Sequence, residues 1–259
     1  MIFRDAELER RFHSDGYITV PLLAAASVAA LQMQFEHPPD LGATAFAASI
    51  MSGDLPYRRR VSAAIAAMIG TRVDELLCDY RIAFCNYAVK DAGLDGGTVE
   101  LHQDWTFVDE SRHESIGVWC PLIDVDPENG CLHVVAGSQR FRRGPRGLFN
   151  TLPVIREDLL RPLPLKAGEA VLFSPRLFHT SPPNRSRATR IAACAVLVPS
   201  QSRLWYVHAV GEGDFEIFEV DDDFYLRHTI AARPEDLAPI ARIEHHAGRI
   251  DLDDLPGPF

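Results

Sequence analysis

The sequence contains no long apolar stretch and no excess of basic residues. No run of apolar residues approaches the roughly 20 that a membrane-spanning helix needs, and the opening residues MIFRDAELERRF are charged where a signal peptide would be apolar. The 26 lysine and arginine residues are outnumbered by 36 aspartate and glutamate residues, which gives a formal net charge of −10. Because this charge disfavours unspecific contact with nucleic acid or anionic lipid, we expect neither kind of partner. The lack of a membrane span and of a signal peptide predicts a cytoplasmic location.

Cysteine motifs, internal repeats and interdomain linkers are missing as well. The five cysteines are odd in number and scattered, without the CxxC spacing of a zinc or redox site. We therefore expect free thiols rather than disulfide bonds. The chain is long enough for one sizeable core, so residues 1–259 are expected to form a single domain. None of these features indicates the oligomeric state.

Helical signals lie mostly in the first part of the chain. Residues 16–23 (GYITVPLL) alternate like a strand, whereas residues 24–35 and 56–77 have the composition and apolar spacing of helices. These patterns predict a helical N-terminal section over about residues 1–78.

Strand signals dominate from residue 79 onward. Short apolar or alternating runs follow one another without helices between them: RIAFCNYAV, ESIGVWCPL, CLHVV, EAVLF and RIAACAVLV. This pattern predicts a sandwich or barrel rather than alternating strands and helices. The expected fold is mainly β with flanking helices, a double-stranded β-helix (jelly-roll, cupin-like) barrel over about residues 79–200.

The C-terminal extension, about residues 201–259, has weaker signals. Gly211-Glu212-Gly213 separates two strand-like runs and predicts one further hairpin. Coil or a short helix is expected after it, and the acidic run Asp221 to Asp223 is expected to be a solvated turn.

Two histidines and an aspartate have the residue types of a non-haem iron site. His102 and Asp104 flank Gln103 in LHQDWTF, and His179 lies far downstream in FHTSPPNRSRATRIA. In an extended segment, residues i and i+2 point to the same side, so His102 and Asp104 can share one ion. Two imidazoles and one carboxylate form the facial triad that holds Fe(II) and leaves coordination positions open. Taken singly, His102 and Asp104 are more simply interpreted as residues of a surface strand. His179 alone is more simply a hydrogen-bonded structural histidine.

Ser181 and Arg190 follow His179 at positions that suit a carboxylate ligand. Arg190 opens the run RIAACAVLV, and an arginine at the start of a buried strand is costly unless its charge is paired. A hydroxyl and a guanidinium here could hold the distal carboxylate of a 2-oxo acid such as 2-oxoglutarate. Arg140 begins a loop with four arginines where an acidic substrate could dock, although a solvated loop is the simpler interpretation.

These segments resemble the phytanoyl-CoA dioxygenase family of Fe(II)- and 2-oxoglutarate-dependent oxygenases. The resemblance runs in the family's order over about residues 12–198, through GYITVPLL, LHQDW, VWCPLIDVDPENGCLHVVAGSQRF and FHTSPPNRSRATR. It implies that His102, Asp104 and His179 bind the iron. It also implies that Arg190 and Ser181 bind 2-oxoglutarate.

Several further positions matter for the resemblance. Residues 136–139 read AGSQ where the family commonly has PGSH, which leaves the ligand set intact and makes the local substrate contacts uncertain. Related halogenases have a small residue at the position of Asp104, so its carboxylate implies hydroxylation or another oxidation. Trp105 and Trp119 are candidates for the substrate pocket. Lys90 ends a predicted strand where related enzymes often present polar groups to the cosubstrate.

The resemblance therefore implies an enzyme with Fe(II), 2-oxoglutarate and O2 as cofactor and cosubstrates. It would hydroxylate an unactivated C–H bond of a small metabolite, such as a natural-product intermediate or an amino-acid-like molecule, and release succinate and CO2. The alternative is a jelly-roll protein that binds a metal or small ligand without redox chemistry. A zinc hydrolase with the same triad ranks third, because Arg190 and Ser181 have no required role in it.

Overall fold

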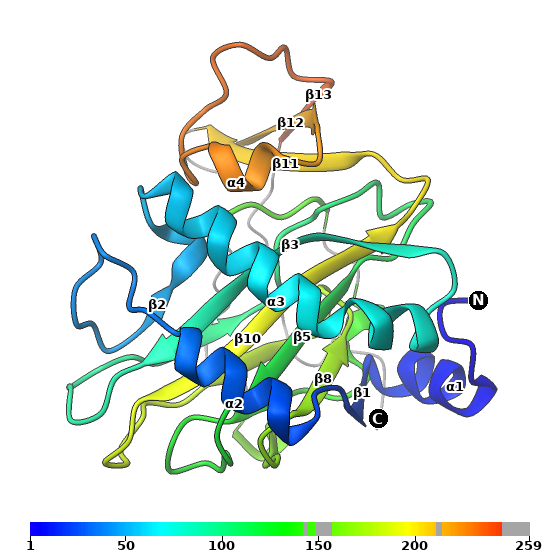
Figure 1. Ribbon diagram of the computed structural model, residues 1–259. Coiled ribbons are helices and arrows are strands. Elements are labelled where there is room, and N and C mark those ends of the chain that lie inside the picture. Colours follow the sequence, from blue (N-terminus) through cyan, green and yellow to red (C-terminus); the bar gives the residue numbers. More distant parts are fainter. Residues whose placement is uncertain (142–143, 149–156, 211–213, 245–259) are drawn as a thin grey trace.

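Two antiparallel sheets form the centre of the computed structural model, which describes residues 1–141, 144–148, 157–210 and 214–244 (Figure 1). The larger sheet has the strand order β1 (Tyr17–Pro21), β8 (Glu169–Phe173), β5 (Ile116–Pro121), β10 (Arg190–Pro199), β3 (Tyr80–Lys90) and β2 (Ala47–Ala48). The smaller sheet has the order β4 (Val99–His102), β9 (His179–Ser181), β6 (Leu132–Val134) and β7 (Arg161–Leu163).

The two sheets face each other across a shared core. Trp119 and Phe173 of the larger sheet pack with Leu132 and Val134 of the smaller one, because successive residues of a strand point to opposite faces and one face of each sheet is apolar. The expected mainly β, jelly-roll fold with flanking helices is thus confirmed. Among the described residues the two sheets share no strand pair, so the barrel is a two-layer sandwich rather than a closed ladder.

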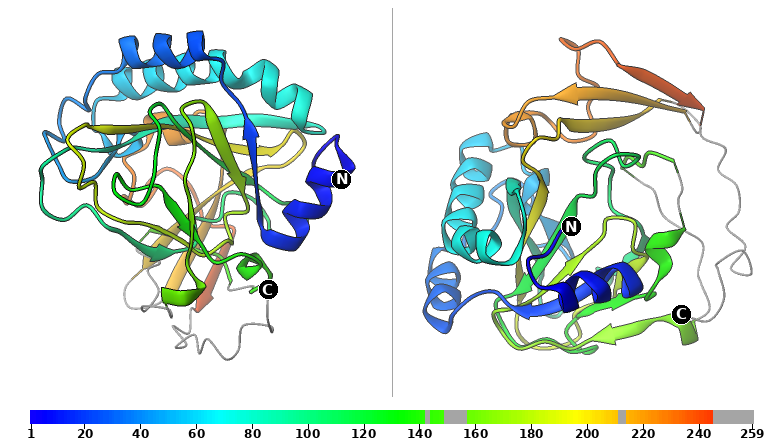
Figure 2. Two further views of the ribbon diagram at one scale, coloured as in Figure 1. Left: turned by 90° about the horizontal axis from the view of Figure 1, so that it is seen from below. Right: turned by 90° about the vertical axis from the view of Figure 1, so that its right-hand side faces the viewer.

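Helices cover the outer face of the larger sheet. They are α2 (Ala25–Gln34) and α3 (Leu55–Leu76), which confirm the helices predicted over residues 24–35 and 56–77 (Figures 1 and 2). In α3, Ile65, Ile69 and Val73 recur at helical spacing and belong to the same apolar core as alternate residues of β3. Asp54 caps the start of α3 by accepting the Tyr57 N–H at 2.9 Å.

The first 78 residues also contribute a strand to the sandwich. The segment predicted from residues 16–23 forms β1, which pairs with β8 at the edge of the larger sheet. The preceding helix α1 (Ala6–Asp15) was not predicted, since its residues are mostly polar and only Phe12 is buried. It ends at Gly16, whose φ of +81° and contact with Gln139 leave no room for a Cβ.

The C-terminal extension forms a third sheet at one end of the sandwich (Figure 1). Its strands are β11 (Leu204–Val210), β12 (Asp214–Val220) and β13 (Ala241–Glu244), and the short helix α4 (Phe224–Arg227) follows β12. The strands of the predicted hairpin are confirmed, with Val210 opposite Asp214, and residues 211–213 between them lie outside the described residues. Strand β13 was not predicted, because two of its four residues are charged.

The acidic run after β12 is largely exposed, as expected for a solvated turn, and each of its carboxylates pairs with an arginine. The pairs are Asp221 with Arg227 at 2.6 Å, Asp222 with Arg81 at 2.9 Å, and Asp223 with Arg59 at 2.5 Å. Two of these arginines belong to α3 and β3, so the run ties the extension to the rest of the molecule.

The remaining elements are three single-turn 3-10 helices, η1 (Ser49–Met51), η2 (Ser138–Arg140) and η3 (Glu157–Leu159). All five cysteines are free thiols, as predicted. Within the described ranges, no helix is both long enough and apolar enough to cross a bilayer.

Candidate metal centre

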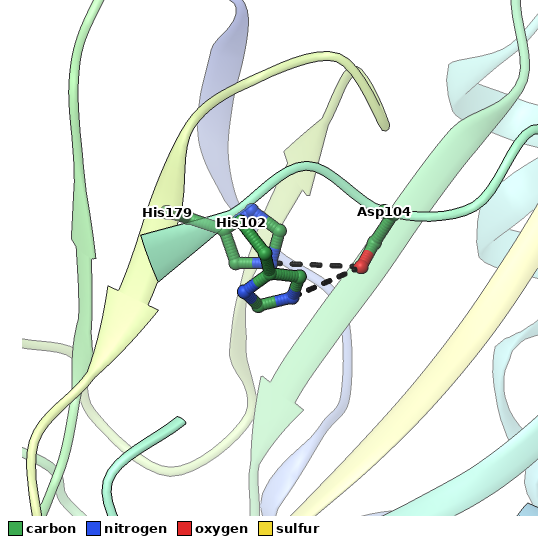
Figure 3. Close-up of side chains that lie close together, drawn as sticks. All are labelled: His102, Asp104 and His179. Atoms are coloured by element: carbon green, nitrogen blue, oxygen red, sulfur yellow. Dashed lines mark ion pairs between the residues drawn. The ribbon is translucent and has the colours of Figure 1, made fainter. Parts of the chain in front are cut away.

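His102, Asp104 and His179 come together at the edge of the smaller sheet (Figure 3). His102 ends β4 and lies opposite His179, the first residue of β9. Because opposite residues of an antiparallel pair project to the same face, their rings lie only 4.2 Å apart between centroids. Asp104 Oδ1 lies 3.5 Å from His102 Nε2 and 3.6 Å from His179 Nε2. The potential ligand atoms all lie within 4.8 Å of one another, so one ion fits between them.

Asp104 reaches this position from just beyond the strand. Strand β4 ends at His102, and the Asp104 N–H donates to the Pro175 carbonyl at 2.8 Å. Gln103 is buried on the other side, where its Nε2 donates to the Arg176 carbonyl at 2.6 Å. His102 and Asp104 thus face the site and Gln103 faces away, as inferred from the sequence. Asp104 lies beyond β4, so its hydrogen bond to Pro175 fixes this orientation instead of strand pairing.

Both imidazoles present the same nitrogen to the site. Nδ1 of His102 lies 2.7 Å from the Glu100 carbonyl, and Nδ1 of His179 lies 2.9 Å from the Leu177 carbonyl. Because a carbonyl oxygen only accepts, each Nδ1 carries the proton and each Nε2 keeps its lone pair for a metal.

The charges of Asp104 and His179 also suit a cation. Burial lowers the pKa of His102, but its contacts with Asp104 outweigh burial and raise this pKa above its usual value. Burial raises the pKa of Asp104, but the two imidazoles and Arg146 outweigh it and leave this pKa below its usual value. Burial, reinforced by His102, lowers the pKa of His179 to about 4. An ionised carboxylate and a neutral imidazole are the protonation states that metal binding requires.

Arg146 holds the Asp104 segment in place and was missed by the sequence reasoning. Its side chain is fully buried, Nε donates to the Asp104 carbonyl at 2.9 Å, and both terminal nitrogens contact Glu110 at 2.9 and 2.5 Å. In the sequence, Arg146 is one of four arginines in a loop. Only the fold shows that Arg146 pairs with a carboxylate 36 positions away.

Arg190 and Ser181 line the same cavity as the three candidate ligands. The Arg190 guanidinium is buried, lies 5.4 Å from the Trp119 ring centroid, and donates from one terminal nitrogen to the Ala88 carbonyl at 3.0 Å. Its Nε has no hydrogen-bond partner among the described residues, and burial lowers its pKa to about 10. A buried arginine that has no carboxylate partner in the described part of the chain fits an anionic ligand at this end of the cavity.

Lys90 of β3 lies opposite Arg190 on the neighbouring strand β10, and its side chain holds Ser181 in position. The buried Lys90 Nζ donates to the Ser181 hydroxyl at 2.7 Å, to the Ser181 carbonyl at 2.8 Å, and to the Pro182 carbonyl. The Ser181 hydroxyl in turn donates to the Gly130 carbonyl at 2.9 Å. Burial and the neighbouring Arg190 lower the pKa of Lys90 to about 7.

The candidate substrate contacts fall into two groups. Trp105 and Trp119 line the cavity, together with Asn86, which the sequence did not single out. Arg140 lies on η2 at a different pocket, beside Glu114 and Arg176. The structure therefore brings two of the three candidates to the metal site and places Arg140 apart from it.

Comparison with known proteins identifies the family of the chain. Residues 12–192, more than half of the chain, match the family model for phytanoyl-CoA dioxygenase (PhyH). The chain belongs to the phytanoyl-CoA dioxygenase family. Within the family, phytanoyl-CoA dioxygenase domain-containing protein 1 of Danio rerio is 34% identical over 132 residues, 46% of this chain and 45% of that protein. The chain thus matches less than half the length of this curated relative.

Solved structures share the family fold at lower identity. EvdO2 from Micromonospora carbonacea var. aurantiaca, complexed with 2-oxoglutarate, is 18% identical with a TM-score of 0.53, covering 75% of this chain and 91% of that chain. The non-haem α-ketoglutarate-dependent epimerase SnoN from nogalamycin biosynthesis is 20% identical with a TM-score of 0.54, covering 92% of this chain and 91% of that chain. The fold therefore extends beyond the segment that the family model matches.

Proposed function

We propose that this family member is an Fe(II)- and 2-oxoglutarate-dependent oxygenase that hydroxylates an unactivated C–H bond of a small metabolite. The observation that carries this proposal is one cavity lined by both the His102, Asp104 and His179 cluster and the buried Arg190. A metal-binding protein without redox chemistry needs the cluster but has no use for the arginine.

The three side chains fit an iron ion by chemistry and by placement. Two neutral imidazoles and a carboxylate, without a thiolate, are the ligand set of non-haem Fe(II) oxygenases, and three protein ligands leave other coordination positions open. When bound, Fe(II) with 2-oxoglutarate and O2 supplies an oxidative decarboxylation that gives succinate and CO2 and places one oxygen atom in the substrate. His102 and His179 would bind through Nε2, and Asp104 through its carboxylate.

The other end of the cavity would hold the cosubstrate. The Arg190 guanidinium would pair with the distal carboxylate of 2-oxoglutarate and satisfy the Nε donor that has no partner in the described residues. The Ser181 hydroxyl would turn from the Gly130 carbonyl to the same carboxylate, while Lys90 keeps the serine in position. As an iron ligand, the carboxylate of Asp104 would take the coordination position that a halide needs, which supports hydroxylation over halogenation in this proposal.

Anaerobic visible absorption tests the proposal directly. Purified protein is titrated with Fe(II) and then with 2-oxoglutarate, and a charge-transfer band that needs both additions is expected from the chelate. Arg190→Met should bind Fe(II) normally and require far more 2-oxoglutarate for the same band. A folded protein that binds metal but gives no band at saturating 2-oxoglutarate would instead be a non-redox binding protein.

A further inference from the structure

The cavity has a second end that the metal and cosubstrate do not use. Along the inner face of β10 and β3, the opposite pairs are Arg190 with Lys90, Cys194 with Asn86, and Val196 with Phe84. The six residue-to-residue steps from Arg190 to Val196 span roughly 20 Å along an extended strand. The Arg190 end is polar, whereas the end at Val196 is apolar and is completed by Ile50 and Phe107.

This apolar end adjoins the metal ligands. The Phe173 ring lies 5.0 Å from the His179 ring, and Phe173 is opposite Gly117, which is itself opposite Val196. Trp105 directly follows Asp104, and its ring lies 6.1 Å from that of Phe107. A molecule at the apolar end would therefore present a carbon atom to the metal from the side opposite Arg190.

The C-terminal extension forms the layer behind this end of the cavity. The Tyr225 ring stacks on Phe84 at 4.8 Å and meets Phe107 edge-on at 5.6 Å. The Tyr225 hydroxyl donates to the Trp205 carbonyl at 2.5 Å, and the Trp205 N–H donates to the Phe107 carbonyl at 2.8 Å. The aromatic wall thus depends on residues after position 200, which lie beyond the segment matched by the family model.

Contacts of one buried and one exposed arginine hold this layer against the body of the protein. Arg58 of α3, 2% exposed, donates to the carbonyls of Tyr225 at 3.3 Å and His228 at 2.7 Å. The next residue, Arg59, makes two contacts of 2.5 Å with the carboxylate of Asp223. Such donors on consecutive residues fix α4, and with it the ring of Tyr225, relative to α3.

The charges along the cavity restrict what the apolar end accepts. Among the described residues that line it, Arg190 is the only arginine or lysine. Once 2-oxoglutarate pairs with Arg190, the described lining offers no further arginine or lysine to a carboxylate or phosphate of the substrate. An unpaired anion in such surroundings is strongly disfavoured.

We propose that the C-terminal extension shapes the substrate subsite and that this subsite takes an uncharged, ring-bearing apolar molecule or part of one. The inference rests on the oxygenase proposal and narrows its substrate class away from amino-acid-like molecules. Tyr225 is a specificity-determining residue that acts through Phe84 and Phe107, whose side chains line the cavity.

A matched pair of probes tests the charge preference. The anaerobic complex with Fe(II) and 2-oxoglutarate is titrated with 2-naphthol, which is neutral at pH 7, and with 2-naphthoate, which has the same rings and a carboxylate. Calorimetry should show at least about tenfold tighter binding of 2-naphthol, because the carboxylate lacks a partner. Equal or tighter binding of 2-naphthoate, or no binding of 2-naphthol, overturns the proposal.

Substitutions test the part played by the extension. Tyr225→Leu should weaken 2-naphthol binding about three- to tenfold, the range that loss of an aromatic pair implies, with 2-oxoglutarate affinity unchanged. In a Phe84→Leu background the effect of Tyr225→Leu should shrink, since its stacking partner is gone. Phe12→Leu is the control, because Phe12 is an equally buried ring that packs on Phe3, away from the cavity.

The results separate this inference from the oxygenase proposal. A folded Tyr225→Leu protein that binds 2-naphthol as tightly as the parent protein overturns the role of the extension. The probe titrations are repeated on metal-free Arg190→Met protein, which lacks the guanidinium that would otherwise pair with 2-naphthoate, so probe selectivity is measured even if no charge-transfer band forms. Probe selectivity without the band contradicts the oxygenase proposal alone, and the band without selectivity contradicts this inference alone.

Discussion

The two ends of the cavity are built by different kinds of interaction. At the polar end, directional hydrogen bonds fix each functional group: carbonyls orient both imidazoles, Arg146 holds the Asp104 segment, and Lys90 holds Ser181. At the apolar end, stacked rings contributed partly by the C-terminal extension form the wall. Catalytic geometry tolerates little displacement, whereas an apolar wall tolerates exchange of side chains of similar volume. Residues at the polar end should therefore tolerate few substitutions, whereas side chains of the apolar wall can be exchanged more freely.

Loss of a metal ligand is expected to have the largest effect and to be confined to the polar end. His179→Ala removes one of three ligands, and we expect Fe(II) binding at micromolar concentrations and the charge-transfer band to disappear. The measurement is anaerobic Fe(II) binding followed by absorption. His133→Ala is the matched control, since His133 lies opposite Thr180 on the neighbouring strand and is not in the cluster. Unchanged iron affinity in His179→Ala would remove His179 from the ligand set.

Removal of the buried arginine should come next. Arg190→Met deletes the charge that pairs with the distal carboxylate, and two charge-assisted hydrogen bonds are worth about 3 kcal/mol or more, roughly 100-fold in affinity. We expect the dissociation constant for 2-oxoglutarate to rise by about this factor while Fe(II) binding is retained. Arg187→Met, at an exposed position of the preceding loop, should leave both unchanged. A 2-oxoglutarate affinity equal to that of the parent protein would contradict the clamp.

The role of Arg146 in positioning Asp104 can be tested without changing the Asp104 carboxylate. Arg146→Met keeps an unbranched, flexible side chain, although a shorter one, and loses the contacts to Glu110 and to the Asp104 carbonyl. Residues that orient metal ligands through hydrogen bonds typically contribute about 10- to 100-fold in metal affinity. We expect the Fe(II) affinity to fall by a factor in that range, measured by competition with a chelator. Because Arg146 is fully buried, thermal unfolding of the metal-free variant is measured alongside. A variant with reduced stability and full iron affinity would show that Arg146 matters only for folding.

Lys90 should give the smallest effect, seen as a pH dependence. Its pKa of about 7 means that the side chain is charged below pH 7 and mostly neutral well above it. A bound dianion favours the charged form, so 2-oxoglutarate affinity should fall a few-fold as pH rises from 7 to 9, measured by titration of the absorption band. Lys90→Met should bind more weakly at pH 7 and lose most of this dependence. The same pH dependence of 2-oxoglutarate affinity in the parent protein and in Lys90→Met would assign the titration to another group.

The sequence predicted the polar end better than the apolar end for a physical reason. His102, Asp104 and His179 belong to short local patterns whose spacing reflects strand geometry, and the structure brings these three residues together. Arg190 was singled out because a charge at the start of a buried strand needs a partner, and its side chain lies in the same cavity. In each case the residue type and its local setting carried the information.

The contacts that depend on distant segments could not be predicted in this way. Arg146 and Glu110 pair across 36 positions, Arg58 reaches Tyr225 across 167, and neither pair has a local sequence pattern. The same limit explains Arg140, which the sequence could not distinguish from Arg146 within one loop, although the fold places the two at different sites. Alternation and helical spacing identified most elements, while β13 and α1 lacked the apolar periodicity that such predictions need.

The order of residues along the chain separates the two tasks of the cavity. The candidate metal and cosubstrate contacts all lie between residues 90 and 190, whereas Tyr225 and Trp205 lie in the last quarter. Under the proposed function, a gene that acquired a different final segment would keep the residues of the metal and cosubstrate site and change only those that support the aromatic wall. Recombination and mutation downstream of Ser200 would then give this architecture a route to new substrates with an unchanged reaction.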